Sequence, residues 1–309
     1  MRLAFTGDLH VDVSQKNWDL VPILAEFVKI IDPDIFVLCG DISPDIEQVE
    51  YTLELFSGVS CEKIFVPGNH DIWVSDKELQ EGGHDSFEKY FCLLPQVCYS
   101  QGFIPLWMEP VIHDGVGFVG TIGWYDYSFG SGLFQFTEDE YSLKTFRDNI
   151  WNDLRYARWV DASSMFEKYY DCIPDSEVSR QFNTKLSQDI NGMTGKKDVR
   201  EIVVVTHHPP FRELITFKGD PLWDYFSAFM GSSETGKLLL QEPKVTHAIC
   251  GHLHERNDRF IGQIRALSAS VGYLYQDRRK PIRIVEDSLG LIHVIDSSEL
   301  FGSIGGISS

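Results

Sequence analysis

Five short blocks of the sequence combine acidic, amide and imidazole side chains with glycine or proline. Each block follows an apolar run that is typical of a short strand, and six of the ten histidines lie in these blocks. Because ligands bind at the carboxyl ends of strands in open α/β sheets, we expect the blocks to form one site. The blocks are Gly7-Asp8-Leu9-His10, Gly40-Asp41-Ile42-Ser43, Gly68-Asn69-His70-Asp71, Thr206-His207-His208-Pro209-Pro210 and Gly251-His252-Leu253-His254.

Two of the blocks place two polar side chains two residues apart. In an extended backbone such side chains point to the same side, so Asp8 with His10, and His252 with His254, can each offer two ligands to one centre. A glycine directly precedes each pair and allows the backbone to turn sharply there. Carboxylate, amide and imidazole donors without cysteine suit Mn, Fe, Zn or Ni better than a thiolate site or an all-oxygen calcium site.

The candidate ligands are numerous enough for two metal ions. A carboxylate can bridge two metals, so Asp41 could serve both ions. Two divalent ions outweigh two carboxylates and a bridging hydroxide and leave a net charge of about +1 at the centre. Such a centre would attract an anion even though the 309-residue chain carries a net charge of −19. The seven candidates are Asp8, His10, Asp41, Asn69, His207, His252 and His254.

The elements that must position these residues alternate between strand and helix. Apolar runs in the first seventy residues alternate with two segments of helical spacing, which predicts β-α-β connections and an α/β fold. Strands are expected at 3–6, 35–39, 63–66, 116–120, 202–206, 248–250, 282–286 and 291–295, and helices at 20–31, 46–56 and 233–240. A hairpin turn at 287–290 is expected between the last two strands.

The ordered blocks D-x-H, G-D, G-N-H-D, H-x-P and G-H-x-H resemble those of the calcineurin-like metallophosphoesterases. One block alone is common by chance, but five in this order, each after a strand-like run, form a specific pattern. The resemblance covers about residues 1–75 and 200–255. It implies a four-layer α/β/β/α sandwich, in which helices flank two central mixed β-sheets. We expect a single domain of residues 1–309 with a helical, aromatic-rich insertion or cap at about 124–193.

The resemblance also implies a role for each candidate. One metal ion would be held by Asp8, His10, Asp41 and His254. The other ion would be held by Asp41, Asn69, His207 and His252. A hydroxide that bridges the ions would attack phosphorus, because metal ions acidify bound water. His70 would lie outside the ligands, where it would stabilise the phosphate charge and protonate the leaving oxygen. His70 and Asp71 are therefore the candidate catalytic residues.

Two positions leave alternatives open. Many relatives carry G-D-x-x-D, whose second aspartate can orient the outer histidine, but Pro44 stands at that position here. Asp71 or Asp45 could replace the missing acid, or no residue does. His207 occupies the position of the H-x-P motif, which leaves His208 outside the ligands or facing the substrate.

Four residues near the blocks are candidates for substrate contact. Trp124 and Tyr125 follow the strand expected at 116–120, although such aromatic residues can equally pack the core of the insertion. Arg212 follows the His-His-Pro-Pro block and could contact a phosphate, although a surface position is an ordinary alternative. His208 is the fourth candidate.

Composition restricts the partners and the compartment. A net charge of −19 is the opposite of the basic face that binds long nucleic acid. No signal peptide or membrane span is visible, since Asp8 interrupts the first apolar run and Glu26 and Lys29 interrupt the most apolar helical segment. None of the six cysteines forms a C-x-x-C pair. We therefore expect unpaired thiols and a cytoplasmic protein that does not bind a membrane.

These patterns favour an enzyme that hydrolyses a P–O bond of a small phosphomonoester or phosphodiester. Its cofactors would be two divalent or trivalent transition-metal ions (Mn, Fe, Zn or Ni). The alternative is a non-catalytic scaffold of the same fold that binds a partner protein. A scaffold predicts lost ligands, whereas all seven candidates are present. No pattern in the sequence indicates an oligomeric state.

Overall fold

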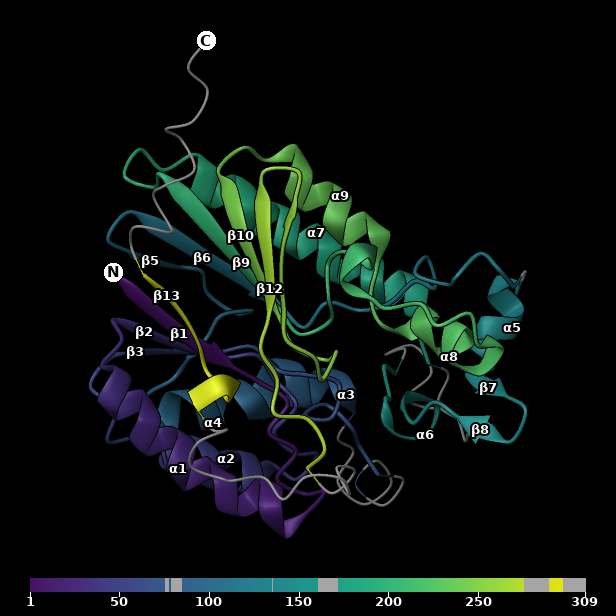
Figure 1. The fold of residues 1–309 in the computed structure, drawn as a ribbon, viewed down its shortest axis with the longest axis horizontal. Coiled ribbons are helices and arrows are strands. Elements are labelled where there is room, and N and C mark those ends of the chain that lie inside the picture. The colour runs from purple at the N-terminus through teal and green to yellow at the C-terminus, as the bar shows by residue number, and fades with distance from the viewer. Residues whose placement is uncertain (76–77, 79–84, 135, 161–171, 275–288, 297–309) are drawn as a thin grey trace.

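Two β-sheets lie face to face at the centre of the fold, and helices cover the outer face of each sheet (Figure 1). The computed structural model describes residues 1–309 except 76–77, 79–84, 135, 161–171, 275–288 and 297–309. The layers are those of the four-layer α/β/β/α sandwich that the resemblance implies, so this prediction is confirmed.

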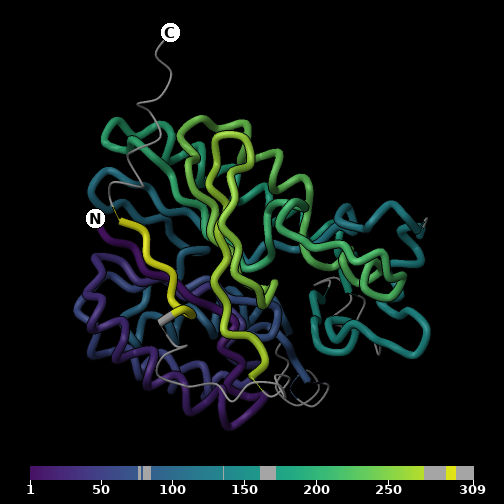
Figure 2. The backbone as a smooth tube through the Cα atoms, in the orientation of Figure 1, coloured from purple at the N-terminus to yellow at the C-terminus, as the bar shows by residue number. Residues whose placement is uncertain are grey.

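The first sheet consists of β1 (Arg2–Thr6), β2 (Ile35–Leu38), β3 (Glu62–Phe65), β4 (Ile104–Pro105) and β13 (His293–Asp296). Its order is β13-β1-β2-β3-β4. β1 to β4 are parallel, whereas β13 pairs antiparallel with β1. Figure 2 shows this pair as the purple start of the chain beside its yellow last strand.

The second sheet consists of β5 (Val111–His113), β6 (Val116–Thr121), β9 (Glu201–Thr206), β10 (Val245–Cys250), β11 (Asn257–Ile261) and β12 (Ile264–Ser268). Its order is β11-β12-β10-β9-β6-β5. The four central strands are parallel, and the edge strands β5 and β11 pair antiparallel with their neighbours. Both sheets are therefore mixed, as predicted.

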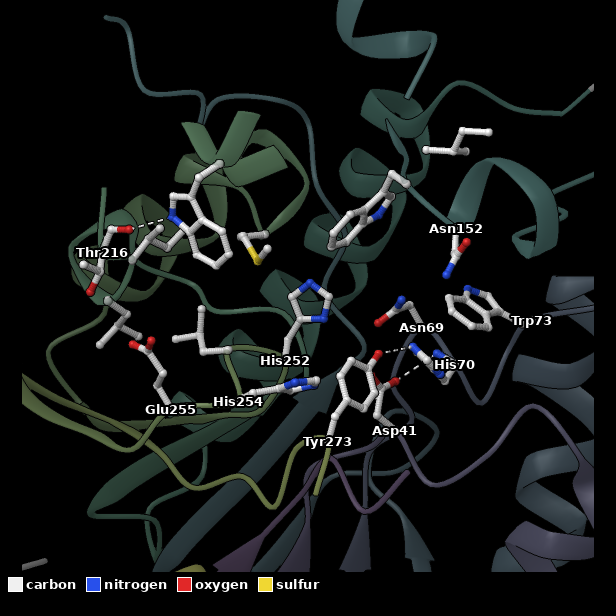
Figure 3. A pocket seen from close by; sticks show the side chains of 17 residues that line it. Asp41, Asn69, His70, Trp73, Asn152, Thr216, His252, His254, Glu255 and Tyr273 are labelled. Atoms are coloured by element: carbon white, nitrogen blue, oxygen red, sulfur yellow. Dashed lines mark hydrogen bonds between the residues drawn. The ribbon is translucent and has the colours of Figure 1, made fainter. Parts of the chain in front are cut away.

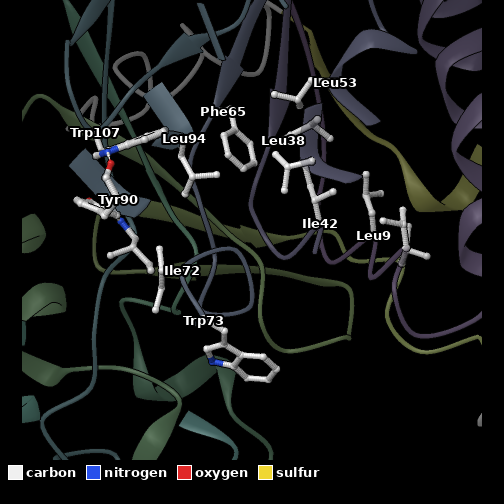
Figure 4. Close-up of a cluster of buried hydrophobic side chains, with 14 of the residues drawn as sticks. Leu9, Leu38, Ile42, Leu53, Phe65, Ile72, Trp73, Tyr90, Leu94 and Trp107 are labelled. Atoms are coloured by element: carbon white, nitrogen blue, oxygen red, sulfur yellow. Dashed lines mark hydrogen bonds between the residues drawn. The ribbon is translucent and has the colours of Figure 1, made fainter. Parts of the chain in front are cut away.

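Helices form the two outer layers. The first sheet is covered by α1 (Gln15–Ile31), α2 (Ile46–Glu54), α3 (Ser86–Glu88), a π-helical turn (Lys89–Leu93) and α4 (Leu94–Ser100). The second sheet is covered by α7 (Asp175–Thr194) and α9 (Ser233–Gln241). Figure 4 shows part of the first helical layer, where Leu38 and Phe65 of the sheet lie beside Leu53 and Leu94.

Alternate residues of one strand enter different cores. In β1, Leu3 and Phe5 pack between the two sheets, whereas Ala4 packs under the helices. In β9, Val203 and Val205 pack between the sheets, and the intervening residue faces α7 and α9. This is why the strands read as continuous apolar runs in the sequence.

The helix α1 illustrates how local sequence sets the outer layer. The Ser14 side chain accepts a hydrogen bond from the backbone N–H three residues later and so caps the first turn. Leu20, Leu24 and Val28 are buried at helical spacing against the sheet. Asp32 then adopts a left-handed conformation with φ of 49° and ends the helix.

Shorter elements form a lobe beside the sandwich, on the right of Figure 1. They are α5 (Glu138–Ser142), the hairpin of β7 (Thr145–Phe146) and β8 (Asn149–Ile150), α6 (Asp153–Tyr156) and α8 (Pro221–Phe226). Phe136, Tyr141, Tyr225 and Phe229 pack their rings together in this lobe. Phe136 and Tyr141 of region 124–193 thus help to fill the core of the lobe, while α7 packs on the second sheet.

Other expectations have mixed outcomes. The six cysteines are free thiols, as predicted. The strand expected at 282–286 lies outside the described residues, and residues 289–291 form a 3-10 turn ahead of β13. The sequence did not predict β11 or β12. β11 lacks an apolar pattern because it is an edge strand with three exposed positions. Among the residues that the structure describes, no helix combines the length and apolar character of a membrane span.

Candidate metal centre and active site

The five blocks meet where five parallel strands end. Each block begins within three residues of the last residue of β1, β2, β3, β9 or β10. Across the blocks, five polar residues have positive φ, between +45° and +68°, namely Asp8, His10, Asp41, His252 and His254. Such a conformation costs a residue other than glycine about 1–3 kcal/mol and persists only where its surroundings enforce it.

Backbone hydrogen bonds between the loops enforce these conformations. The N–H of Asp8 donates to the carbonyl of Gly40 at 2.8 Å, and the N–H of His10 donates to the carbonyl of Asp41 at 2.9 Å. The Asp8 carbonyl accepts from Gly272 at 2.9 Å. The loops thus fix one another and direct the polar side chains toward a common point.

The first set of converging side chains, here called the His10 group, consists of Asp8, His10, Asp41 and His254. One donor atom from each lies within 4.8 Å of the others. His10 Nε2 is 2.9 Å from His254 Nε2 and 3.7 Å from Asp41 Oδ2. Two carboxylates and two imidazoles form the kind of donor set that holds a transition metal.

The second set, here called the His207 group, consists of Asp41, His207 and His252. His207 Nε2 lies 3.3 Å from Asp41 Oδ2, 3.2 Å from His252 Nδ1 and 3.2 Å from Asn69 Oδ1. The Nδ1 of His207 donates to the Cys39 carbonyl at 2.7 Å, which directs Nε2 at these atoms. Two oxygens and two ring nitrogens thus meet at one point, and this donor set fits a cation.

The charges of the groups agree with a cation site. Burial acts against a charged His207 ring, but the Asp41 and Asp8 carboxylates outweigh it and raise the pKa of His207 to about 9. Burial lowers the pKa of His10 and His252 well below the ordinary value, which leaves both rings neutral. Neutral His10 and His252 are in the state that binds a metal ion, whereas His207 would release its proton to bind one.

Asp153 organises the lobe side of the site and was not singled out in the sequence. Its carboxylate is buried and accepts hydrogen bonds from Asn69 Nδ2 at 3.0 Å, Trp73 Nε1 at 2.7 Å, Tyr125 Oη at 3.1 Å and Trp151 Nε1 at 2.7 Å. The bond to Asn69 fixes the orientation of its amide, so that Oδ1 faces the His207 group. No spacing rule could find this acid, because its partners come from three segments, around residues 69–73, 125 and 151.

His70 lies at the edge of the two groups. Its ring stacks on Trp73 with centroids 3.7 Å apart, and its Nε2 is 3.4 Å from the hydroxyl of Tyr273. Its backbone N–H donates to Asp41 Oδ1 at 2.8 Å. Burial lowers the pKa of the His70 ring, partly offset by the charges of Asp41 and Asp153. The side chain is thus held beside the candidate metal ligands.

A cavity of about 470 Å³ opens over these residues (Figure 3). Asp41, Asn69, His70, His252 and His254 lie in the middle of the view. Trp73 and Asn152 lie on one side of them, and Thr216 and Glu255 on the other. Trp151, Trp223, Tyr273, Leu214, Ile215 and Met230 also line the cavity.

The family model described as calcineurin-like phosphoesterase matches residues 1–256. The chain belongs to the calcineurin-like phosphoesterase family. Among solved structures it is similar to phosphopantetheinyl hydrolase from Mycobacterium tuberculosis, with a TM-score of 0.66, 18% identity and 96% of each chain covered. It also matches a dimetal phosphatase from Danio rerio, with a TM-score of 0.47, 13% identity and 88% of each chain covered. No curated protein sequence matches it significantly.

Asp71 follows His70 in the sequence, but its side chain bonds to backbone groups. Its carboxylate accepts hydrogen bonds from the N–H groups of Asp41, Ile42, Ser43 and Gly68 at 2.7–3.0 Å. Asp45 caps α2 by accepting from the N–H of Glu47. Both acids thus accept hydrogen bonds from backbone N–H groups. In their described contacts, neither acid takes the place of the G-D-x-x-D aspartate that orients the outer histidine in relatives.

None of the four candidates for substrate contact is among the described lining residues of the cavity. Trp124 and Tyr125 are buried, and the indole of Trp124 donates to Asp175 Oδ1 at 2.8 Å. His208 packs against Trp124, and burial lowers its pKa to about 3. Arg212 donates to the carbonyls of residues 130 and 131. His208 also packs against the candidate ligand His252, with ring centroids 4.4 Å apart. The aromatic lining of the cavity comes instead from Trp73, Trp151, Trp223 and Tyr273, which the sequence did not single out for substrate contact.

Proposed function

We propose that this chain is a dinuclear metal-dependent phosphoesterase that hydrolyses a P–O bond of a small phosphomonoester or phosphodiester. The observation that carries the proposal is the position of Asp41, which belongs to both the His10 group and the His207 group. A shared carboxylate is what a bridge between two metal ions requires, and membership of the phosphoesterase family makes phosphate the natural ligand.

The residues fit two ions of Mn, Fe, Zn or Ni. Asp8, His10, Asp41 and His254 would hold one ion. Asp41, Asn69, His207 and His252 would hold the other. When bound, the ions would supply an acidified water molecule and positive charge against the phosphate oxygens.

The chain's own residues would complete the site. His70 would donate a hydrogen bond to a phosphate oxygen and a proton to the leaving oxygen. Trp73 would hold the imidazole by stacking, and Asp153 would hold Trp73 and Asn69 together through two hydrogen bonds. Asp71 would keep the loop of Asp41 in place. These contacts would link the candidate proton donor and the candidate ligand Asn69 through one buried carboxylate.

The test combines metal content with turnover. Purified protein would be assayed with p-nitrophenyl phosphate and bis(p-nitrophenyl) phosphate in Mn²⁺ and in EDTA, and metal content would be measured by mass spectrometry. We expect two ions per chain and turnover that EDTA removes. Asp41→Asn should lower turnover by more than about a hundredfold, since even residues behind the ligands cost about 10–100-fold.

The matched control is Asp198→Asn, an exposed aspartate before β9 that should leave metal content and turnover unchanged. Circular dichroism would establish that both variants fold. Two bound ions without turnover of either ester would support the scaffold instead. Turnover that survives EDTA or Asp41→Asn would overturn the proposal.

A further inference from the structure

The cavity extends to both sides of the candidate metal ligands. One side, here called the Trp73 arm, is lined by Trp73, Ile150 and Asn152. The other, here called the Trp223 arm, is lined by Leu214, Ile215, Thr216, Trp223 and Met230. In Figure 3, Trp73 and Asn152 lie on one side of Asp41 and His252, and Thr216 lies on the opposite side. A phosphomonoester has one organic group and would fill one arm only.

The lining of both arms is mainly apolar and aromatic. Among the described residues that line the cavity, none is lysine or arginine, and Asp41 and Glu255 are acidic. The ammonium of Lys218 lies 3.5 Å from the centroid of the Trp223 ring and does not belong to the described lining. A further phosphate or carboxylate on the substrate would therefore find no lysine or arginine among the described residues of either arm.

The Trp223 arm is built before any ligand arrives. The indole of Trp223 donates to the Thr216 carbonyl at 2.8 Å, a bond drawn in Figure 3. Asp220 caps α8 by accepting from the N–H groups of Leu222 and Trp223. These bonds fix a large apolar surface, and a fixed surface binds an organic group at a low entropic cost.

We propose, resting on the proposed function, that the substrate is a phosphodiester of two uncharged organic groups, one in each arm. Hydrolysis adds water across one P–O bond. The water oxygen joins phosphorus, and the electron pair of the broken bond stays on the leaving alcohol, which takes a proton. Because His70 stacks on Trp73, the leaving alcohol lies in the Trp73 arm. The Trp223 arm holds the group that is released as a phosphomonoester.

The test uses three esters that share p-nitrophenol as the leaving group. They are phenyl p-nitrophenyl phosphate, methyl p-nitrophenyl phosphate and p-nitrophenyl phosphate, assayed with Mn²⁺. We expect kcat/KM for the phenyl diester to exceed that for the other two by about tenfold or more, the effect of burying one aromatic ring. A monoester rate equal to or above that of the phenyl diester would overturn the inference while the proposed function stands.

Variants then locate the retained group. Trp223→Ala should remove the phenyl preference, because it should lower kcat/KM for the phenyl diester by about tenfold more than kcat/KM for the methyl diester. The matched control is Trp18→Ala, which removes a partly buried tryptophan stacked on Tyr51 outside the cavity. It should leave all three rates unchanged. Equal losses for all three esters in Trp223→Ala would mean that Trp223 supports the fold and does not select the substrate.

Binding separates the two proposals from each other. Calorimetry would compare diphenyl phosphate with phenyl phosphate on protein loaded with Mn²⁺. Tighter binding of diphenyl phosphate, lost in Trp223→Ala, supports the inference even where no ester is turned over, and absent turnover then counts only against the proposed function. Tighter binding of phenyl phosphate overturns the inference.

Discussion

At the scale of single residues, the candidate centre depends on which atoms face it. Asn69 can offer either its amide oxygen or its nitrogen, and Asp153 decides between them by accepting from Nδ2. The same carboxylate holds Trp73, on which His70 stacks. One buried acid thereby fixes the orientation of a candidate ligand and of the candidate proton donor.

Asp153→Asn tests this coupling. The variant places an amide where four donors point, so we expect metal affinity and kcat each to fall about 10–100-fold. Titration of Mn²⁺ into the metal-free variant measures the affinity. Asp175→Asn is the control, because Asp175 accepts from Trp124, Tyr127 and Lys144 in the same lobe without touching the ligands. Equal losses of metal affinity in both variants would mean that Asp153 only stabilises the lobe and does not orient Asn69.

His70→Gln tests proton donation. A general acid contributes about 10²–10⁴-fold where the leaving group is a poor one. We therefore expect a loss of that size for a diester that releases phenol, and a much smaller loss for one that releases p-nitrophenol. The comparison of kcat for the two diesters is the measurement. A loss that is independent of the leaving group would assign His70 to phosphate binding alone.

At the scale of elements, the loops after the strands carry the site, and they approach one another very closely. A Cβ on Gly68 would lie 2.1 Å from Asp41 Oδ1, whereas one on Gly192 in α7 would meet nothing within 4 Å. We expect Gly68→Ala to displace the Asp41 carboxylate and to abolish metal binding in a calorimetric titration. Gly192→Ala should keep metal binding and raise the free energy of unfolding by about 0.5–1 kcal/mol. Unchanged metal affinity in Gly68→Ala would contradict this packing.

The strand β9 begins with a buried acid, which gives a prediction for pH. Burial raises the pKa of Glu201 above its ordinary value, although Thr246 Oγ1 donates to it at 3.1 Å. Since the folded pKa is the higher one, ionisation of Glu201 destabilises the fold at neutral pH, and this cost disappears as pH falls below the unfolded pKa. Glu201→Gln should therefore raise the urea midpoint at pH 7.5 and have little effect at pH 4. If Glu201→Gln changed the urea midpoint equally at pH 7.5 and pH 4, ionisation of Glu201 would not be the cause.

The sequence predicts those elements whose own residues carry the signal. β1, β2, β6, β9 and β10 are largely buried on both faces and appear as apolar runs, and β3 ends in buried Ile64 and Phe65. β11 lies at an edge with exposed polar residues and has no such signal. In the same way, the five blocks mark the candidate ligands, whereas Asp153, Trp223 and Tyr273 depend on contacts between distant segments. Such contacts follow from the tertiary fold and not from spacing.

At the scale of the whole molecule, the candidate centre joins the two sheets. Asp8, Asp41 and Asn69 follow strands of the first sheet, whereas His207 and His252 follow strands of the second. The chain is strongly acidic, and two of its carboxylates are buried together at this junction. Ions bound there would neutralise these carboxylates and cross-link the sandwich.

Metal removal should therefore destabilise the entire fold. A ligand at a hundred times its Kd stabilises the native state by about 2.7 kcal/mol per site, which corresponds to about 5–10 °C in Tm for a domain of this size. Differential scanning calorimetry would compare protein with excess Mn²⁺ and protein in EDTA. We expect one transition that moves down in EDTA, because both sheets lose the cross-link together. The Tm of Asp41→Asn should be the same in Mn²⁺ and in EDTA. If the wild-type Tm were also the same in both, a metal link between the sheets would be ruled out.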